Sequence, residues 1–246
     1  MKPKHRGGYS RRHTKLCERT LLTLLRGLGP WKRGIYLAGG LVPHFLFEDL
    51  VYPGTTDVDL VLDLEILADV EAYRTLERNL RDLGFARGEN DEGRAQHFRW
   101  SRQVEPGSTI LLDLMCPSAA EDPAERVAPL TGERRLSAIR IPGAHLVFRD
   151  YVEHELSGEL LDDHGVATEW IRVSNLVPFL VLKALAYDDR IEEKDAFDLV
   201  FTLLHAPGGP EEVARSFRQR CAEWTDEPLM ERALGILRDR FASADP

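Results

Sequence analysis

The sequence has few cysteines and no apolar run long enough to cross a bilayer. Its three cysteines among 246 residues are odd in number and far apart, with no metal-ligand spacing, so they predict neither a disulfide framework nor a zinc site. No apolar stretch approaches the about 20 residues of a membrane-spanning helix. The basic N-terminus lacks the apolar region of a secretory signal. We therefore expect a cytoplasmic protein that makes no membrane contact.

Basic residues are also in deficit, and they are unevenly distributed. The chain has 41 Asp and Glu against 32 Lys and Arg, a net charge of −9. Residues 1–16 have no acid and six cations, which are Lys2, Lys4, Arg6, Arg11, Arg12 and Lys15. Subtracting these six charges leaves a net charge of −15 on the remainder of the chain. So acidic a body argues against broad binding of phosphate backbones. Residues 1–16 are expected to be a flexible basic arm, which could hold RNA phosphates or be a solubilising tail.

Repeats and low-complexity segments are absent, and two patterns divide the chain. Up to about Val173, short runs rich in aliphatic and aromatic residues, bounded by Gly, Pro or acidic turns, predict strands. They are 34–38, 58–63, 96–101, 109–115, 137–142 and 167–173. Helices are expected over 12–28 and, with Asp69 as N-cap, from there to Gly84.

Strand signals stop after Ser174, which can cap a helix reaching about Tyr187. Three further helices are predicted over 192–205, 211–224 and 228–241, where apolar residues recur at helical spacing. The fold class expected is therefore α/β (α+β): a mixed-sheet domain over 17–173, followed by an all-helical domain over 174–246.

Two acidic residues alternate with apolar ones in the predicted strand that begins near residue 58. Asp57 and Asp59 project to the same side, whereas Val58 and Leu60 project to the other. The two carboxylates, about 7 Å apart along the strand, repel each other unless a cation lies between them. Mg²⁺ fits, because it prefers oxygen ligands and takes one or two carboxylates together with substrate phosphates. A solvated turn is the alternative interpretation of this Asp-x-Asp pattern.

Two further features bear on this choice. Gly39 and Gly40 follow an apolar strand and precede a helical segment, where glycines let backbone N–H groups approach a phosphate. A tight strand-to-helix turn would have the same sequence. Asp113 lies within an apolar strand and needs a partner if buried. It could complete a triad with the first two aspartates, or pair with Arg99 on the preceding strand.

The order of these motifs resembles the nucleotidyltransferase superfamily typified by polymerase β. The resemblance rests on Gly39-Gly40, on Thr55-Thr-Asp-Val-Asp59, and on a third Asp in a later strand. The stretch Val181-Leu-Lys-Ala-Leu-Ala-Tyr-Asp-Asp-Arg-Ile-Glu-Glu-Lys-Asp-Ala-Phe-Asp-Leu199 is similar to a helical motif of AbiEii/MenT-type toxin nucleotidyltransferases.

The resemblance implies an enzyme that moves an NMP from an NTP, such as ATP, to an acceptor hydroxyl and releases pyrophosphate. Mg²⁺, with Mn²⁺ as the alternative ion, would be held by Asp57, Asp59 and Asp113, which are also the expected catalytic residues. The nucleotide would contact Gly39, Gly40, Thr55, Thr56, Lys183 and Asp195. From the sequence itself, the expected helix 176–187 is apolar nearly all round and Lys183 is its only cationic residue, so Lys183 must reach solvent or meet an anion.

The sequence departs from the family pattern at two positions. Leu41 stands where a Ser or Thr usually follows the glycine pair, so that Thr55 or Thr56 would have to supply the hydroxyl. Pro53 replaces an arginine that commonly precedes the Asp-x-Asp strand.

The acceptor is left open by the residues. The resemblance implies RNA, at the 3′ end of tRNA, and a toxin–antitoxin system with an antitoxin protein as partner. The acidic body equally suits a small cationic acceptor, as in aminoglycoside nucleotidyltransferases. A third hypothesis is a nucleotide-binding module without turnover.

Overall fold

A single mixed sheet organises the part of the chain that the computed structural model describes: residues 11–47, 52, 54–65, 70–89, 93, 95–119, 125–130 and 136–241. The strands are β1 (Ile35–Ala38), β2 (Asp57–Leu62), β3 (Ala86–Glu89), β4 (Ala95–Glu105), β5 (Ser108–Ser118), β6 (Val127–Pro129), β7 (Ser137–Pro142), β8 (Tyr151–Glu159) and β9 (Val166–Ser174). The helices are α1 (Arg11–Leu28), α2 (Val42–Leu46), α3 (Val70–Asp82), α4 (Leu146–Arg149), α5 (Leu176–Arg190), α6 (Glu193–His205), α7 (Gly209–Glu223) and α8 (Pro228–Phe241).

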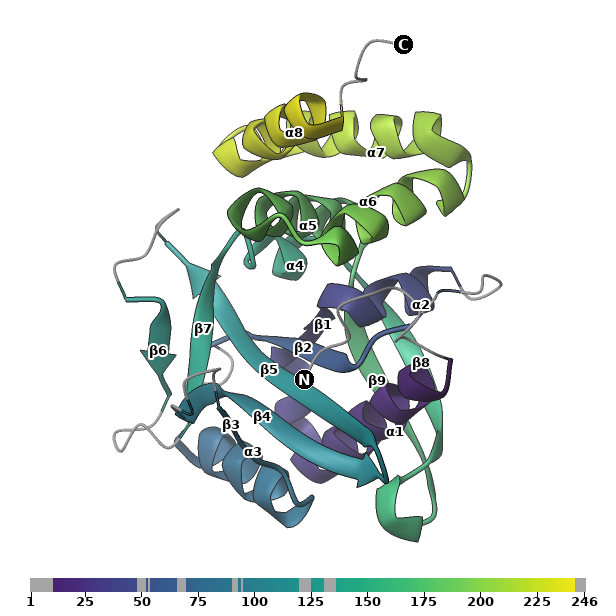
Figure 1. Ribbon diagram of the computed structural model, residues 1–246. Coiled ribbons are helices and arrows are strands. Elements are labelled where there is room, and N and C mark those ends of the chain that lie inside the picture. The colour runs from purple at the N-terminus through teal and green to yellow at the C-terminus, as the bar shows by residue number, and fades with distance from the viewer. Residues whose placement is uncertain are drawn as a thin grey trace.

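The order of the strands places the centre of the sheet at β2 and β5. The sheet runs β3-β4-β5-β2-β1-β9-β8. β2 pairs with β5 in parallel and with β1 antiparallel. On its other edge, β5 pairs first with β4 and then, from Met115 onward, with β7. β2 therefore lies in the middle of the sheet (Figure 1).

The alternation of side chains along β2 separates the core from the other face of the sheet. Val58, Leu60 and Leu62 are fully buried in the main apolar cluster, together with residues of α1 and α3. The residues between them point the other way, because successive side chains of a strand face opposite sides. Of these, Val61 packs in a second apolar cluster with Tyr36 and Ala144. Asp57 and Asp59 thus lie on the face opposite α1.

The helices that follow the sheet close this second face at one end. Figure 1 shows α5 to α8 gathered at one end of the sheet, away from α1 and α3. Asn175 caps α5, since its side-chain oxygen accepts a hydrogen bond from the Leu176 N–H at 2.8 Å. The main apolar cluster continues from the sheet into these helices, where it includes Phe217 of α7 and Ile236 of α8.

The expected fold class, a mixed sheet followed by C-terminal helices, is confirmed. All six predicted strands are present with ends shifted by a few residues, and β7 and α8 have the expected bounds. Three strands were not predicted: β3, β6 and β8. The cap of α5 is Asn175 and not Ser174, which is the last residue of β9. The cap proposed at Asp69 lies outside the described residues.

Only part of the expected basic arm lies within the described residues. Residues 1–10 of the expected basic arm lie outside the described ranges, and residues 11–16 form the first part of α1. Within the described ranges, none of the helices combines the length and the apolar character that crossing a bilayer requires.

Candidate active site

The register between β2 and β5 brings the predicted acidic residues together. Asp59 is paired with Asp113 across the two parallel strands, and Asp57 is paired with Leu111. Register partners in neighbouring strands lie about 5 Å apart and point to the same face. All three carboxylates line one cavity of about 310 Å³. Asp57 and Asp113 are buried, at 8% and 7% exposure, so their charges need compensation by cations.

Arg99 supplies that compensation for Asp113. It is the register partner of Asp113 on β4, the opposite neighbour of β5. Its Nε donates to Asp113 Oδ1 at 2.7 Å and its Nη2 to Oδ2 at 2.5 Å. The hydrogen bond to Asp113 raises the pKa of Arg99 despite partial burial. The structure therefore contains both features that the sequence left as alternatives: Asp113 lies beside Asp59, and it is also paired with arginine.

The residues that the structure describes contain no group of three or more His, Cys, Asp or Glu side chains arranged around a common point as a metal site requires. The bidentate contact with Arg99 explains this at Asp113, because both of its carboxylate oxygens already accept hydrogen bonds. The two aspartates of β2 are the carboxylates best suited to an ion. Two carboxylates suffice for Mg²⁺ when substrate phosphates and water complete the shell.

The glycine pair lies at the end of β1, directly beside Asp59. Ala38 is the register partner of Asp59, and Gly39 opens a 3₁₀ turn with a φ of +67°. A Cβ on Gly39 would lie 1.8 Å from Asp59 Oδ2, so only glycine allows this carboxylate to pack against the turn. Backbone geometry and close approach both require glycine at this position.

Thr55 and Thr56 have different surroundings. Thr55 lines the cavity, and its Oγ1 would be 3.0 Å from a Cβ on Gly40. The same hydroxyl accepts a hydrogen bond from the Asp57 N–H at 3.2 Å. Thr56 is not among the residues that line the cavity; its hydroxyl donates to Asp57 Oδ1 at 3.1 Å. Thr55 therefore faces the glycine turn, whereas Thr56 orients the Asp57 carboxylate.

Lys183 lies in the same cavity, within a buried network of charges. Its Nζ is 2.8 Å from Asp195 Oδ1 and 2.7 Å from Asp198 Oδ2. Asp195 is also bonded to Arg190, whose Nε is 2.6 Å from Oδ2. The anions that Lys183 meets are thus carboxylates of α6, and Arg190 pairs with Asp195.

Lys194 and Tyr52 complete the network. The Lys194 ammonium contacts both the Tyr52 hydroxyl and Asp198, and Tyr52 donates to Asp198 Oδ1 at 2.6 Å. Lys194 Nζ also comes within 4.0 Å of where a Cβ on Gly40 would be. Through its bonds to Tyr52, α6 therefore contacts the chain shortly before Thr55 and β2.

The network shifts the pKa values of its members in opposite directions. Burial alone would lower the pKa of Lys183, but the charges of Asp198 and Asp195 raise it above its ordinary value. Burial would raise the pKa of Asp195, but Lys183 and Arg190 outweigh it and lower that pKa to about 2. Burial, together with the nearby Lys183, lowers the pKa of Lys194 although Asp198 opposes the shift. Lys183 and Asp195 are therefore both charged at neutral pH.

The cavity gathers most of the predicted residues: Gly39, Gly40, Thr55, Asp57, Asp59, Asp113, Lys183 and Asp195 all line it. Sequence reasoning assigned no site role to Lys194 and Asp198, which line it as well. Their spacing of four on one helix was a usable signal, because such pairs share a helix face. Tyr52 gave no such signal, because only the folding of the chain brings it close to the glycine turn.

Neither a protein-family model nor a curated protein sequence matches the chain. Among solved structures it is similar to the crystal structure of an antigenic nucleotidyltransferase-like protein from Paracoccidioides brasiliensis. The similarity has a TM-score of 0.45 and 17% sequence identity, and covers 92% of this chain and 94% of that one. A likeness of this degree establishes neither a family nor an activity, so the function is argued from the site.

Replacing Gly39 by alanine tests the close approach of Asp59 to the turn. Gly39→Ala should destabilise the fold by more than Gly29→Ala, which also has a positive φ of +55° but has nothing within 4 Å of the added Cβ. Both variants bear the backbone cost of about 1–2 kcal/mol, and the former must also displace the carboxylate. Denaturant unfolding measures the difference. Equal losses would mean that Asp59 does not pack against the turn.

The lowered pKa of Asp195 predicts a loss of stability in acid. The group contributes stability above its ordinary pKa of 3.8, and this is lost as pH falls through its folded value of about 2. Asp195→Asn should therefore flatten the fall in the free energy of unfolding between these pH values, by about 2 kcal/mol. Asp226→Asn, at an 82% exposed side chain, is the control for the loss of one carboxylate. Parallel profiles for wild type and Asp195→Asn would refute the assignment.

Proposed function

We propose that the protein is a Mg²⁺-dependent nucleotidyltransferase, which moves an NMP from an NTP to an acceptor hydroxyl. The observation that carries the proposal is the register of β2 and β5, which sets Asp59 beside Asp113 in a cavity that Asp57 also lines. Neighbouring like charges in a partly buried site are costly without a cation. A glycine turn that can receive phosphate lies directly beside them.

Asp57 and Asp59 are the residues that would hold the ion, with Mn²⁺ as an alternative to Mg²⁺. Their carboxylate oxygens are ligands that both hard cations accept. When bound, the ion neutralises triphosphate charge and polarises the phosphorus that is attacked. Thr56 keeps the Asp57 carboxylate in place through its 3.1 Å hydrogen bond. Asp113 is paired with Arg99, which lines the same cavity. Asp113 would therefore take part in the reaction only when Arg99 releases it to bind a phosphate of the substrate.

The triphosphate would lie against the turn at Gly39 and Gly40, with the Thr55 hydroxyl as the replacement for the one missing at Leu41. The Lys194 ammonium lies 4.0 Å from where a Cβ on Gly40 would be, which places a cation at this turn. Lys183 is enclosed by Asp195 and Asp198, so it acts mainly by holding the helices that carry Lys194. Asp195, which we expected to contact nucleotide, would instead act by positioning its partners Lys183 and Arg190.

In the reaction, the acceptor oxygen forms a bond to the α-phosphorus, and the bond from that phosphorus to the bridging oxygen of the β-phosphate breaks. Pyrophosphate leaves with the bonding pair, and the hydroxyl proton passes to Asp113 or to water. The cavity walls position both reactants, which accounts for much of the acceleration in phosphoryl transfer.

The resemblance of the 181–199 segment to toxin nucleotidyltransferases favours RNA as acceptor, at the 3′ end of tRNA, with an antitoxin as the partner. A small cationic acceptor of the aminoglycoside type is the second candidate, favoured by the net charge of −9. A nucleotide-binding module without turnover is the third, and the cluster of like charges speaks against it, because binding alone does not need it.

The test is an incubation with Mg²⁺, each α-labelled NTP in turn, and total tRNA. Wild type should release pyrophosphate and label RNA. Asp59→Asn should lower the rate about a hundredfold or more, because it removes one of two carboxylates from the ion. Asp63→Asn, a matched change just past the end of β2 and outside the cavity, should be near wild type.

Three other outcomes would each change the conclusion. Label on an aminoglycoside and not on RNA would replace the proposed acceptor and keep the reaction. Transfer that survives Asp59→Asn would separate the activity from the carboxylates. Absence of pyrophosphate with every NTP and acceptor, alongside nucleotide binding, would support the module without turnover.

A further inference from the structure

A second hollow of about 430 Å³ opens between β7, α5 and α8. Four arginines line it, and we name it the arginine groove after them: Arg126, Arg140, Arg190 and Arg232. Asp189 is the one acidic residue in its lining. Arginines thus gather here in a chain whose net charge is −9, although Asp195, which lies outside the lining, also pairs with Arg190.

The arginine groove and the reaction cavity share part of their lining. Arg190, Ile139, Ile141, Leu182 and Ala186 line both hollows. The shared wall is apolar apart from Arg190, which suits a sugar or a base.

At least three of the four arginines have an acidic side chain nearby, and Arg126 and Arg232 are both exposed. Arg126 lies 3.8 Å from Asp189, yet 63% of its side chain is exposed. Arg140 donates through Nη1 to the main-chain oxygens of Glu125 and Val127, at 2.8 and 3.2 Å. Guanidinium groups have five donors in a fork that matches phosphate oxygens. The groove is therefore suited to phosphate more than to a cation.

The position of the groove relative to the carboxylates matches the geometry of the proposed reaction. The strand order β1-β2-β5-β7 puts the glycine turn on one side of the three aspartates and the groove on the other. In-line displacement requires the acceptor oxygen and the departing pyrophosphate on opposite sides of the phosphorus. With the triphosphate at the glycine turn, the acceptor comes from the side of β7.

From these observations we propose that the arginine groove binds the acceptor, and that the acceptor bears phosphate groups next to its reactive hydroxyl. This inference rests on the proposed nucleotidyl transfer and specifies its second substrate. It disfavours a cationic aminoglycoside, which the exposed guanidinium groups of Arg126 and Arg232 would repel. It also assigns acceptor binding to Arg126, just before β6, and to described residues of β7, α5 and α8 rather than to the N-terminal basic residues.

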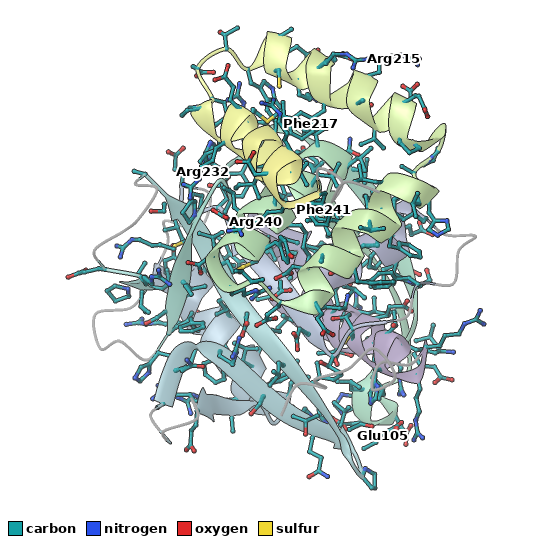
Figure 2. All side chains as sticks on the ribbon, turned by 45° about the horizontal axis from the view of Figure 1, so that its top comes forward. Glu105, Arg215, Phe217, Arg232, Arg240 and Phe241 are labelled. Carbon is teal, nitrogen blue, oxygen red and sulfur yellow. The ribbon has the colours of Figure 1, made fainter. Side chains whose placement is uncertain are left out.

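The test compares two double variants of the full chain. Arg126→Ala with Arg232→Ala removes two exposed guanidinium groups from the groove. Arg215→Ala with Arg238→Ala is the control, because neither residue lines it; Figure 2 shows Arg232 and Arg215 on opposite sides of the helical layer. Binding of a short fluorescent single-stranded RNA is measured by anisotropy at several salt concentrations. Transfer rates are measured with RNA, a nucleoside monophosphate and an aminoglycoside as acceptors.

The groove variant should bind RNA about tenfold more weakly. Its slope of log K against log salt should fall by about 1.4, the contribution of two phosphate contacts to a single strand. KM for the acceptor should rise, while KM for the NTP stays unchanged. The control variant should match wild type in each measurement. Transfer to RNA would identify a strand end, and transfer to the monophosphate alone would identify a small phosphorylated acceptor.

Unchanged RNA binding and unchanged KM for the acceptor in the groove variant would overturn the inference. So would transfer to an aminoglycoside that is indifferent to the two arginines. A failure of the proposed reaction has a different signature: RNA binding that depends on Arg126 and Arg232, with no pyrophosphate released from any NTP. That result would keep the anion site and reject nucleotidyl transfer.

Discussion

The parallel pairing of β2 with β5 is the constraint on which the site depends. It fixes Asp59 opposite Asp113, and a shift of one strand by one residue would turn its aspartate into the apolar core. Each neighbouring strand then supplies an element that this pairing needs. β1 ends in Gly39, whose missing side chain makes room for Asp59, and β4 supplies Arg99 to offset Asp113. The same few contacts therefore shape the candidate site and stabilise the fold.

The helices after the sheet contribute charge in a form that also fixes their position. Lys183 on α5 and Asp195 and Asp198 on α6 form buried ion pairs, which are costly to break because any remaining charge would be uncompensated. Tyr52 extends this network to the segment before β2. The network thus holds Lys194 beside the glycine turn, so that the helical part completes a site whose carboxylates come from the sheet.

Much of this arrangement could be predicted from local sequence. Alternation at Asp57 and Asp59 and the apolar strand around Asp113 both indicated which side chains would face together, because strand periodicity is a local property. The strand β8 was not predicted because its outward-facing residues are polar. It forms a strand through its pairing with β9, which is a tertiary contact. The capture of Lys183 by two carboxylates depends on how α6 folds back on α5, which no periodicity encodes. Tyr52 and the arginine groove likewise arise only from tertiary contacts.

Binding of Mn²⁺ in the presence of a nonhydrolysable NTP analogue tests the central claim most directly, because paramagnetic resonance reports the ion without requiring turnover or an acceptor. The account predicts that wild type binds Mn²⁺ tightly together with the analogue, that Asp57→Asn and Asp59→Asn each abolish this, and that Asp63→Asn does not. Binding that is indifferent to both cavity aspartates would contradict it, since the pairing of β2 with β5 would then have no role in holding an ion.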